Sequence, residues 1–167
     1  MSLKALAERT RIFISTQPVN ATRSSDFELA EFQALDWLQI EGLAFLDRIG
    51  DAGDSLSRKV TAFPFDRAIT TKRGRSAIST ELRFDLAPWR PGQAALLAAE
   101  AGSESWGFRI RLADAPRGGT PSERYFAAAV GSAFEMFGGP NDQPSLGVTL
   151  WRNSNVVRVH AAEPVEH

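Results

Sequence analysis

TTKRGRSAISTELRFDLAPWRPGQAALLAA, residues 70–99, is the most strongly patterned stretch of the chain. In its middle, Leu82, Phe84 and Leu86 alternate with charged residues. Alternation of apolar and polar side chains is the period of a β-strand with one buried face. The stretch therefore predicts a strand over residues 76–87, with these three apolar side chains in the core.

The period changes directly after this strand. Pro91 has a backbone angle that suits the first position of a helix, and Gly102 is a common residue type just past a helix end. Alanine and leucine fill the space between them and favour helix. We expect one short helix near residues 90–102, with Leu96 and Leu97 as its packing contacts.

Further apolar patterns on both sides predict more strands. Each consists of alternating or β-branched residues bounded by turn residues. A short loop or helical turn is expected up to Leu35, and a turn is expected at Gly74. In chain order, the other predicted strands cover residues 11–16, 37–45, 60–65, 106–114, 124–137, 147–152 and 155–161, the last two as separate strands or as one bent strand.

The longest of these strands carries RYFAAAVGSAFEMF. Its large apolar residues fit a period of two, which predicts four of them on one face: Phe126, Val130, Phe134 and Met136. Gly131 within the strand favours a β-bulge.

About seven strands and one helix predict a mostly β fold, an antiparallel β-sandwich or barrel with one flanking helix. A length of 167 residues suits a single domain over 1–167. We expect residues 1–10 to form an N-terminal arm and 161–167 a mobile tail. Residues 47–59 are long for a strand connection, and long connections are usually functional or disordered.

The composition excludes several kinds of site. The absence of cysteine excludes disulfides, thiolate metal sites and cysteine nucleophiles. His160 and His167, the only histidines, lie close to the C-terminus, which argues against a histidine metal site and a Ser-His-Asp triad. No apolar run approaches the ~18 residues of a membrane span, and no signal-peptide core is present. We therefore expect a soluble protein, made inside the cell, without catalytic activity or cofactor.

Charge is segregated along the chain, although the formal net charge is only −1. Residues 26–54 contain eight acidic residues against Arg48 alone, a local net charge of −7. Residues 58–90 contain eight basic and three acidic residues, a local net charge of +5. Either these segments are solvated faces of one monomer, or they form opposite edges that favour head-to-tail self-association.

The order of these segments resembles that of the major tail tube proteins of long-tailed bacteriophages and of phage-like gene transfer agents. The resemblance covers about residues 11–159. Residues 70–99 follow the family's order of turn, alternating strand and Gly-Gln-x-x-Leu helix start, and FQALDWLQIEGL at 32–43 is similar to its first full strand. WGFRIRLAD, RYFAAAVGSAFE and GVTLWRNSNVVRV, which includes an Asn-Ser-Asn turn, are similar to its final strands.

The resemblance implies a structural subunit, not an enzyme, that forms hexameric rings stacked into a tube. The channel would carry DNA, without sequence-specific binding, and the tape measure protein. Tail terminator and distal tail proteins would be further partners. Residues 47–59 fall where the family has its extended hairpin loop, so this loop and the arm at 1–10 would bridge neighbouring rings. The protein would belong to the virion tail, assembled in the host cytoplasm, with no membrane partner and no cofactor.

Together with the charge segregation, the resemblance predicts contacts between subunits or rings at charged residues of the long loop and of the turn that follows it. These residues are Asp47, Arg48, Asp51, Asp54, Arg58, Lys59, Lys72, Arg73 and Arg75. A DNA channel should not be strongly basic, because a basic lining would bind the DNA. Any arginines on that face would therefore need nearby carboxylates: Arg83, Arg109 and Arg111 offset by Glu81, Asp85 and Glu123.

Three other functions stay open on the sequence alone. The inner tube protein of a contractile or type VI-like injection system would share the fold. A small-ligand-binding β-barrel would need an apolar pocket with a few polar groups. An enzyme on a β-sandwich has only scattered carboxylates in its favour.

Overall fold

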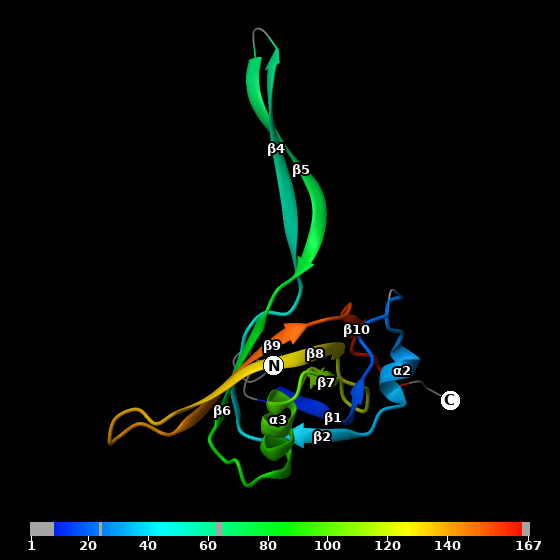
Figure 1. The fold of residues 1–167 in the computed structure, drawn as a ribbon. Coiled ribbons are helices and arrows are strands. Elements are labelled where there is room, and N and C mark those ends of the chain that lie inside the picture. The colour runs from blue at the N-terminus through cyan, green and yellow to red at the C-terminus, as the bar shows by residue number, and fades with distance from the viewer. Residues whose placement is uncertain (1–8, 24, 63–64, 165–167) are drawn as a thin grey trace.

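The computed structural model describes residues 9–23, 25–62 and 65–164, and within them the chain forms ten strands and two helices (Figure 1). The strands are β1 (Arg11–Val19), β2 (Trp37–Ile40), β3 (Leu43–Leu46), β4 (Asp51–Ala62), β5 (Phe65–Ala77), β6 (Thr80–Asp85), β7 (Ser105–Arg111), β8 (Glu123–Met136), β9 (Ser145–Arg152) and β10 (Val157–Val159). The helices are α2 (Leu29–Gln33) and α3 (Pro91–Ala101). The mostly β, antiparallel fold class is confirmed. Parts of the predicted arm, tail and 60–65 strand (residues 1–8, 165–167 and 63–64) lie outside the described residues.

Eight strands form one antiparallel sheet in the order β2-β1-β7-β8-β9-β6-β3, with β10 beside β8. β2 and β3 stand at opposite ends of this order, yet only Glu41 and Gly42 separate them. The sheet must therefore curl back toward its own edge. Gly42 has φ of 86°, a conformation that favours glycine. The single strand predicted over 37–45 is wrong, because the chain turns this corner within it.

The hydrophobic core lies within the curled sheet and beneath α3. Leu82 and Phe84 are buried, as their alternation predicts, and Leu86 packs against the core edge. The largest fully buried side chains come from strands on both sides of the curl, from α2 and from α3: Ile12, Ile14, Phe32, Ile40, Leu96, Phe108, Ile110, Phe126, Leu146 and Leu150.

α3 begins at Pro91 and is followed by Gly102, as the sequence predicts. It packs against β1, β2 and β8. Leu96 is fully buried, and Leu97 is partly buried against the core. The flanking helix predicted near 90–102 is therefore confirmed in position and orientation of its apolar side chains.

A buried polar side chain on α3 was not predicted. Gln93 accepts a hydrogen bond from the backbone N–H of Ala87 at 2.9 Å, and its amide group donates to the carbonyl oxygens of Asp85 at 2.7 Å and Glu41 at 3.0 Å. These three bonds join the β2–β3 corner to the end of β6. Gln93 therefore closes the region where the sheet meets its own edge.

β8 contains the predicted bulge, but its consequence differs from the prediction. The pairing of β8 with β9 shifts register between Val130 and Ser132, which leaves Gly131 as the extra residue. The extra residue inverts the alternation after it. Phe134 and Met136 consequently lie on the outer face and are 55% and 38% exposed. The prediction that they share a face with Val130 is wrong.

Most of the segment predicted as a long loop at 47–59 is not irregular but belongs to a long β-hairpin, at the place where the resemblance implies an extended hairpin loop. β4 and β5 pair along their whole length, over twelve residue pairs. The turn predicted at Gly74 lies inside β5, next to a bulge at Arg73. Figure 1 shows the hairpin projecting away from the rest of the molecule.

Candidate functional site

The β4–β5 hairpin is the most exposed element of the fold. Its strands form a separate two-stranded sheet, and each of its residues with a described side chain is exposed. At about 3.3 Å per residue, the twelve residues of β4 extend about 40 Å. Isolated two-stranded hairpins are marginally stable in water. A hairpin of this length therefore suits contact with another molecule.

The two faces of the hairpin differ in chemistry. Leu56 lies opposite Thr71, and alternation places Ile69 on the same face. Leu56 and Ile69 are 51% and 43% exposed. Lys72 and Arg75 pair with alternate residues of β4 and lie on the other face. One face of the ribbon is thus partly apolar, and the other is basic.

The structure gathers the predicted contact residues on the hairpin and its base. Asp47 and Arg48 precede the hairpin, where the N–H of Asp47 donates to the carbonyl oxygen of Glu81 at 2.9 Å. The hydroxyl of Thr80 donates to the carbonyl oxygen of Arg48 at 3.1 Å. The other seven lie in its strands: Asp51, Asp54, Arg58, Lys59, Lys72, Arg73 and Arg75. The side chains of Arg58 and Lys59 lie outside the described part.

Asp51 is engaged within its own chain. Its carboxylate pairs with Arg152 of β9, whose side chain is only 2% exposed. The hydrogen bond from Arg152 lowers the pKa of Asp51 from its ordinary value. Sequence reasoning missed Arg152, because its partner Asp51 lies about a hundred residues away in the chain and no local sequence pattern indicates the pair.

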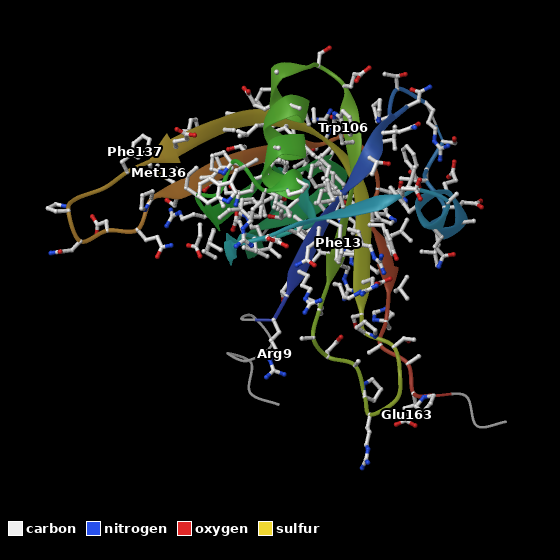
Figure 2. All side chains as sticks on the ribbon, turned by 90° about the horizontal axis from the view of Figure 1, so that it is seen from below. Arg9, Phe13, Trp106, Met136, Phe137 and Glu163 are labelled. Carbon is white, nitrogen blue, oxygen red and sulfur yellow. The ribbon has the colours of Figure 1, made fainter. Side chains whose placement is uncertain are left out.

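The outer face of the sheet carries a second exposed surface. Strand pairing aligns one residue from each of four strands in a row: Phe45 of β3, Arg83 of β6, Gly147 of β9 and Phe134 of β8. With Met136, these residues line a groove of about 250 Å³. We call Phe45, Phe134 and Met136 the apolar strip. Figure 2 shows Met136 and the exposed Phe137 on the arm formed by the ends of β8 and β9. Exposed apolar patches of this kind often mark protein interfaces.

Arginines on the neighbouring part of the sheet are paired. Glu123 accepts hydrogen bonds from Arg109, Arg111 and the Tyr125 hydroxyl. Burial raises the pKa of Glu123, but these hydrogen bonds outweigh it and hold the pKa below its ordinary value. Burial and the hydrogen bond to Glu123 raise the pKa of Tyr125 to about 12. Both guanidinium groups also lie over the Phe13 ring, at 5.2 and 5.6 Å. Glu123 therefore offsets the charge of Arg109 and Arg111, two of the three arginines for which the sequence predicts nearby carboxylates.

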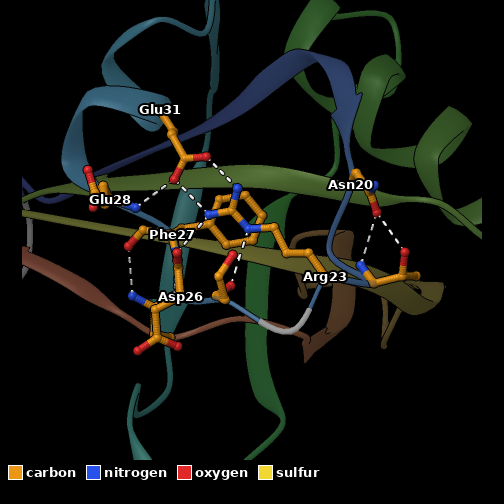
Figure 3. Close-up of polar contacts among 9 residues, drawn as sticks. Asn20, Arg23, Asp26, Phe27, Glu28 and Glu31 are labelled. Carbon is orange, nitrogen blue, oxygen red and sulfur yellow. Dashed lines mark hydrogen bonds and ion pairs between the residues drawn. The ribbon is translucent and has the colours of Figure 1, made fainter.

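A polar cluster secures the segment that leads into α2 (Figure 3). The Arg23 guanidinium lies 3.9 Å from the centre of the Phe27 ring and pairs with Glu31, with Nη2–Oε2 at 2.7 Å. Glu31 also accepts from the backbone N–H of Glu28 at 2.7 Å. The Asn155 side chain bonds both backbone groups of Phe27, at 2.8 and 3.0 Å. The turn before β10 therefore holds this segment on the sheet.

The Glu31 carboxylate should titrate far below an ordinary glutamate. The hydrogen bond from Arg23 and the one from the Glu28 backbone lower its pKa to about 2. Because the folded pKa is depressed, the stabilisation is complete above the ordinary value of 4.5 and is lost as pH falls through about 2. We expect an NMR titration of the Glu31 side chain to show a midpoint near 2. Arg23→Gln should raise the midpoint, whereas Arg158→Gln on β10 should not; an ordinary midpoint in the unmodified chain would refute the pairing.

A groove of about 630 Å³ is lined in part by Arg9, Arg11 and Arg111, and it is open and basic. Within residues 9–164, apart from the gaps noted above, no three His, Asp or Glu side chains gather as metal ligands. Over the same residues, no helix has the length and hydropathy needed to cross a bilayer.

Comparison with known proteins identifies solved structures with a similar fold. No protein-family model and no curated protein matches the sequence. Among solved structures, the chain is similar to the SPP1 tail tube, with a TM-score of 0.51 and 13% identity over 89% of this chain and 75% of that one. It is similar to a chain of the sheath-tube complex of the extracellular contractile injection system PVC, with a TM-score of 0.58 and 11% identity over 96% and 99%. It is also similar to a chain of the anti-feeding prophage tube-terminating cap, with a TM-score of 0.60 and 12% identity over 91% and 88%. These similarities, together with the curled antiparallel sheet, its flanking helix and its projecting hairpin, show that the chain has a phage tail tube-like fold.

Proposed function

We propose that this chain is the structural subunit of a phage-type tail tube, built from hexameric rings that stack on one another. The observation that carries the proposal is the β4–β5 hairpin, which forms a two-stranded sheet of its own and extends away from the rest of the molecule (Figure 1). A stacked tube needs an element that reaches from one subunit to the next. The fold shared with the SPP1 tail tube supports this role.

Within a ring, β8 offers an edge for pairing with the next subunit. β7 pairs with β8 only as far as Ala129. From Val130 to Met136, β8 pairs with β9 on one side, and no described strand pairs with its other side. Open strand edges invite association, and a heterologous contact that closes on itself makes a ring. Phe134 and Met136, two residues of the apolar strip, lie on the same part of β8 and would be covered by the same neighbour.

Between rings, we assign the contact to the hairpin. Its exposed charges Asp54, Lys72, Arg73 and Arg75 are the predicted contact residues best placed to reach another ring. Complementary charge would align the hairpin with the acidic segment at 26–54 of the next subunit. Asp47 and Arg48 would contribute at the hairpin base, and Arg58 and Lys59 along β4.

The tube would conduct DNA and the tape measure protein. Pairing of Arg109 and Arg111 with Glu123 reduces the positive charge of that sheet face, which suits a channel that must not retain DNA. The protein would act structurally rather than as an enzyme, in the virion tail after assembly in the host cytoplasm. Tail terminator and distal tail proteins would bind the two ends of the tube.

A second candidate is the inner tube protein of a contractile injection system. The similarity to a chain of the PVC sheath-tube complex, which covers 96% of this chain and 99% of that one, favours it. Such a tube would share the ring and hairpin contacts but would also present an outer surface to a sheath.

Electron microscopy of the purified, untagged chain tests the proposal. We expect hollow tubes or stacked rings, and light scattering that rises with concentration. Phe45→Ser with Phe134→Ser should abolish them while leaving the circular dichroism spectrum unchanged, because both side chains are about half exposed and lie outside the core. Trp89→Ser, at an exposed tryptophan outside the strip, is the matched control. A chain that stays monomeric at high concentration, or a double variant that still forms tubes, would contradict the proposal.

A further inference from the structure

Few contacts hold the hairpin at a fixed angle to the body. β4 and β5 pair with each other and belong to no larger sheet. The links that join them to the body are residues 47–50 and 78–79. Asp47 and Arg48 take part in hydrogen bonds through their backbone groups, and Ile49 packs against the core. These contacts stop at Ile49, so they leave rotation of the hairpin beyond that residue open. The direction of a 40 Å hairpin, roughly its length at 3.3 Å per residue, must be set at its base.

Arg152 occupies that base. Its guanidinium donates to the carbonyl oxygen of Gly50 at 2.7 Å and pairs with the carboxylate of Asp51, the first residue of β4. A third bond goes to the carbonyl oxygen of Ser154, at 2.9 Å. The guanidinium group of Arg152 therefore binds both the base of the hairpin and the body of the protein.

The chemistry of Arg152 argues for positioning rather than for stability alone. Its side chain is 2% exposed, and its Nε has no hydrogen-bond partner among the residues that the structure describes. Burial of a charged group with a donor unsatisfied is costly, and apolar side chains of similar volume often stabilise such a place better. An apolar side chain, however, has no hydrogen-bond donors, whereas the planar guanidinium group of arginine presents several donors in a rigid, forked arrangement that can bind two oxygens in a defined geometry.

The turn that follows Arg152 is itself bound to the body of the protein. The Ser154 hydroxyl accepts from the N–H of Ala127 on β8 at 2.7 Å, and the N–H of Asn153 donates to the Ala127 carbonyl oxygen at 2.9 Å. Asn155 holds the Phe27 backbone. The Asn-Ser-Asn turn is thus anchored to the sheet and to the segment before α2, and Arg152 is anchored to the turn.

We propose that Arg152 is a positioning residue that sets the direction of the β4–β5 hairpin relative to the body. Its bonds to Gly50 and Asp51 stop rotation at the hairpin base, so the hairpin points one way before it meets any partner. The consequence for tube assembly, pre-orientation toward the next ring, rests on the proposed function. The positioning itself concerns the single chain.

Spin labels measure this direction in the unassembled chain. The chain contains no cysteine, so Thr71→Cys on the hairpin and Ala98→Cys on the exposed side of α3 give one defined label pair. With Arg152 intact, pulsed electron paramagnetic resonance should give a narrow distance distribution. Arg152→Met should broaden it at least about twofold, and Arg152→Lys should restore part of the narrowing, since lysine keeps the charge but not the fork. Arg158→Met, at an exposed arginine of β10, should leave the width unchanged.

Asp51→Asn separates positioning from folding. It removes the charge of the partner but keeps an acceptor oxygen, and the bonds from Arg152 to Gly50 and Ser154 remain, so the thermal midpoint should fall less than in Arg152→Met while the distribution broadens. An unchanged width in folded Arg152→Met would overturn the proposal. If that variant does not fold, an unchanged width in Asp51→Asn overturns it instead. Failure of the unmodified chain to form tubes would contradict the proposed function alone, because the distance measurement does not depend on assembly.

Discussion

Removal of the hairpin is expected to abolish tube formation while the rest of the chain stays folded. Asp51 and Ala77 face each other across the ladder, so replacement of residues 52–76 by Asn-Gly joins them with a two-residue hairpin loop. Among the residues whose burial the structure describes, no core residue lies between Asp51 and Ala77. The thermal midpoint should therefore change by no more than about 4 °C, equivalent to ~1 kcal/mol for a chain of this size.

Circular dichroism, size-exclusion chromatography and electron microscopy give the three readouts. We expect a native spectrum, a single small species and no tubes. A shorter deletion, in which Asn-Gly joins Leu56 to Thr71, is the matched control, because it keeps the basic residues near the base and removes only the outer part. Tubes formed by the fully deleted chain would refute the assignment of the inter-ring contact to the hairpin.

Sequence patterns predicted the elements that pack on the core of their own chain. Burial of one face imposes the alternation seen at Leu82 and Phe84, and helix-end chemistry marks α3 at Pro91 and Gly102. The hairpin has no such face to bury within the chain. Apart from the stretch at 60–65, its strands therefore show little hydrophobic alternation, and Gly53 and Gly74 within them are residues typical of turns and loops.

The candidate surfaces were harder to predict for two physical reasons. The first is the bulge at Gly131. One extra residue moves Phe134 to the outer face, so alternation counted from the start of the strand assigns the wrong face to every residue after the bulge. The second is long-range contact. Arg152 bonds Asp51 and Gln93 bonds Glu41, and in both cases only the tertiary fold brings the partner near, so the local sequence does not indicate these bonds.

Gly92→Ala is expected to destabilise the protein by about 3 kcal/mol or more, the upper range for overpacking against atoms that cannot move away. A Cβ at this position would lie 2.1 Å from the carbonyl oxygen of Gln39 and 2.7 Å from the Cα of Ile40, both backbone atoms of β2. In a helix with free space at this position, Gly→Ala stabilises the protein by ~1 kcal/mol, so a destabilising effect would indicate the clash with β2. Gly102→Ala is the control: its Cβ would meet nothing closer than 3.8 Å, and its φ of −100° suits alanine.

Urea unfolding curves with the same m-value as the unmodified chain would give the free energy of unfolding of both variants. Relief of the clash requires α3 to move away from β2, and that movement would break the bonds from Gln93 to Glu41 and Asp85. The corner held by Gln93 leads through β3 directly into the hairpin base. Folded Gly92→Ala should therefore also form tubes poorly at temperatures well below its unfolding midpoint. A variant as stable as the unmodified chain would show that the helix does not need its close approach to β2, and that the corner is held by Gln93 alone.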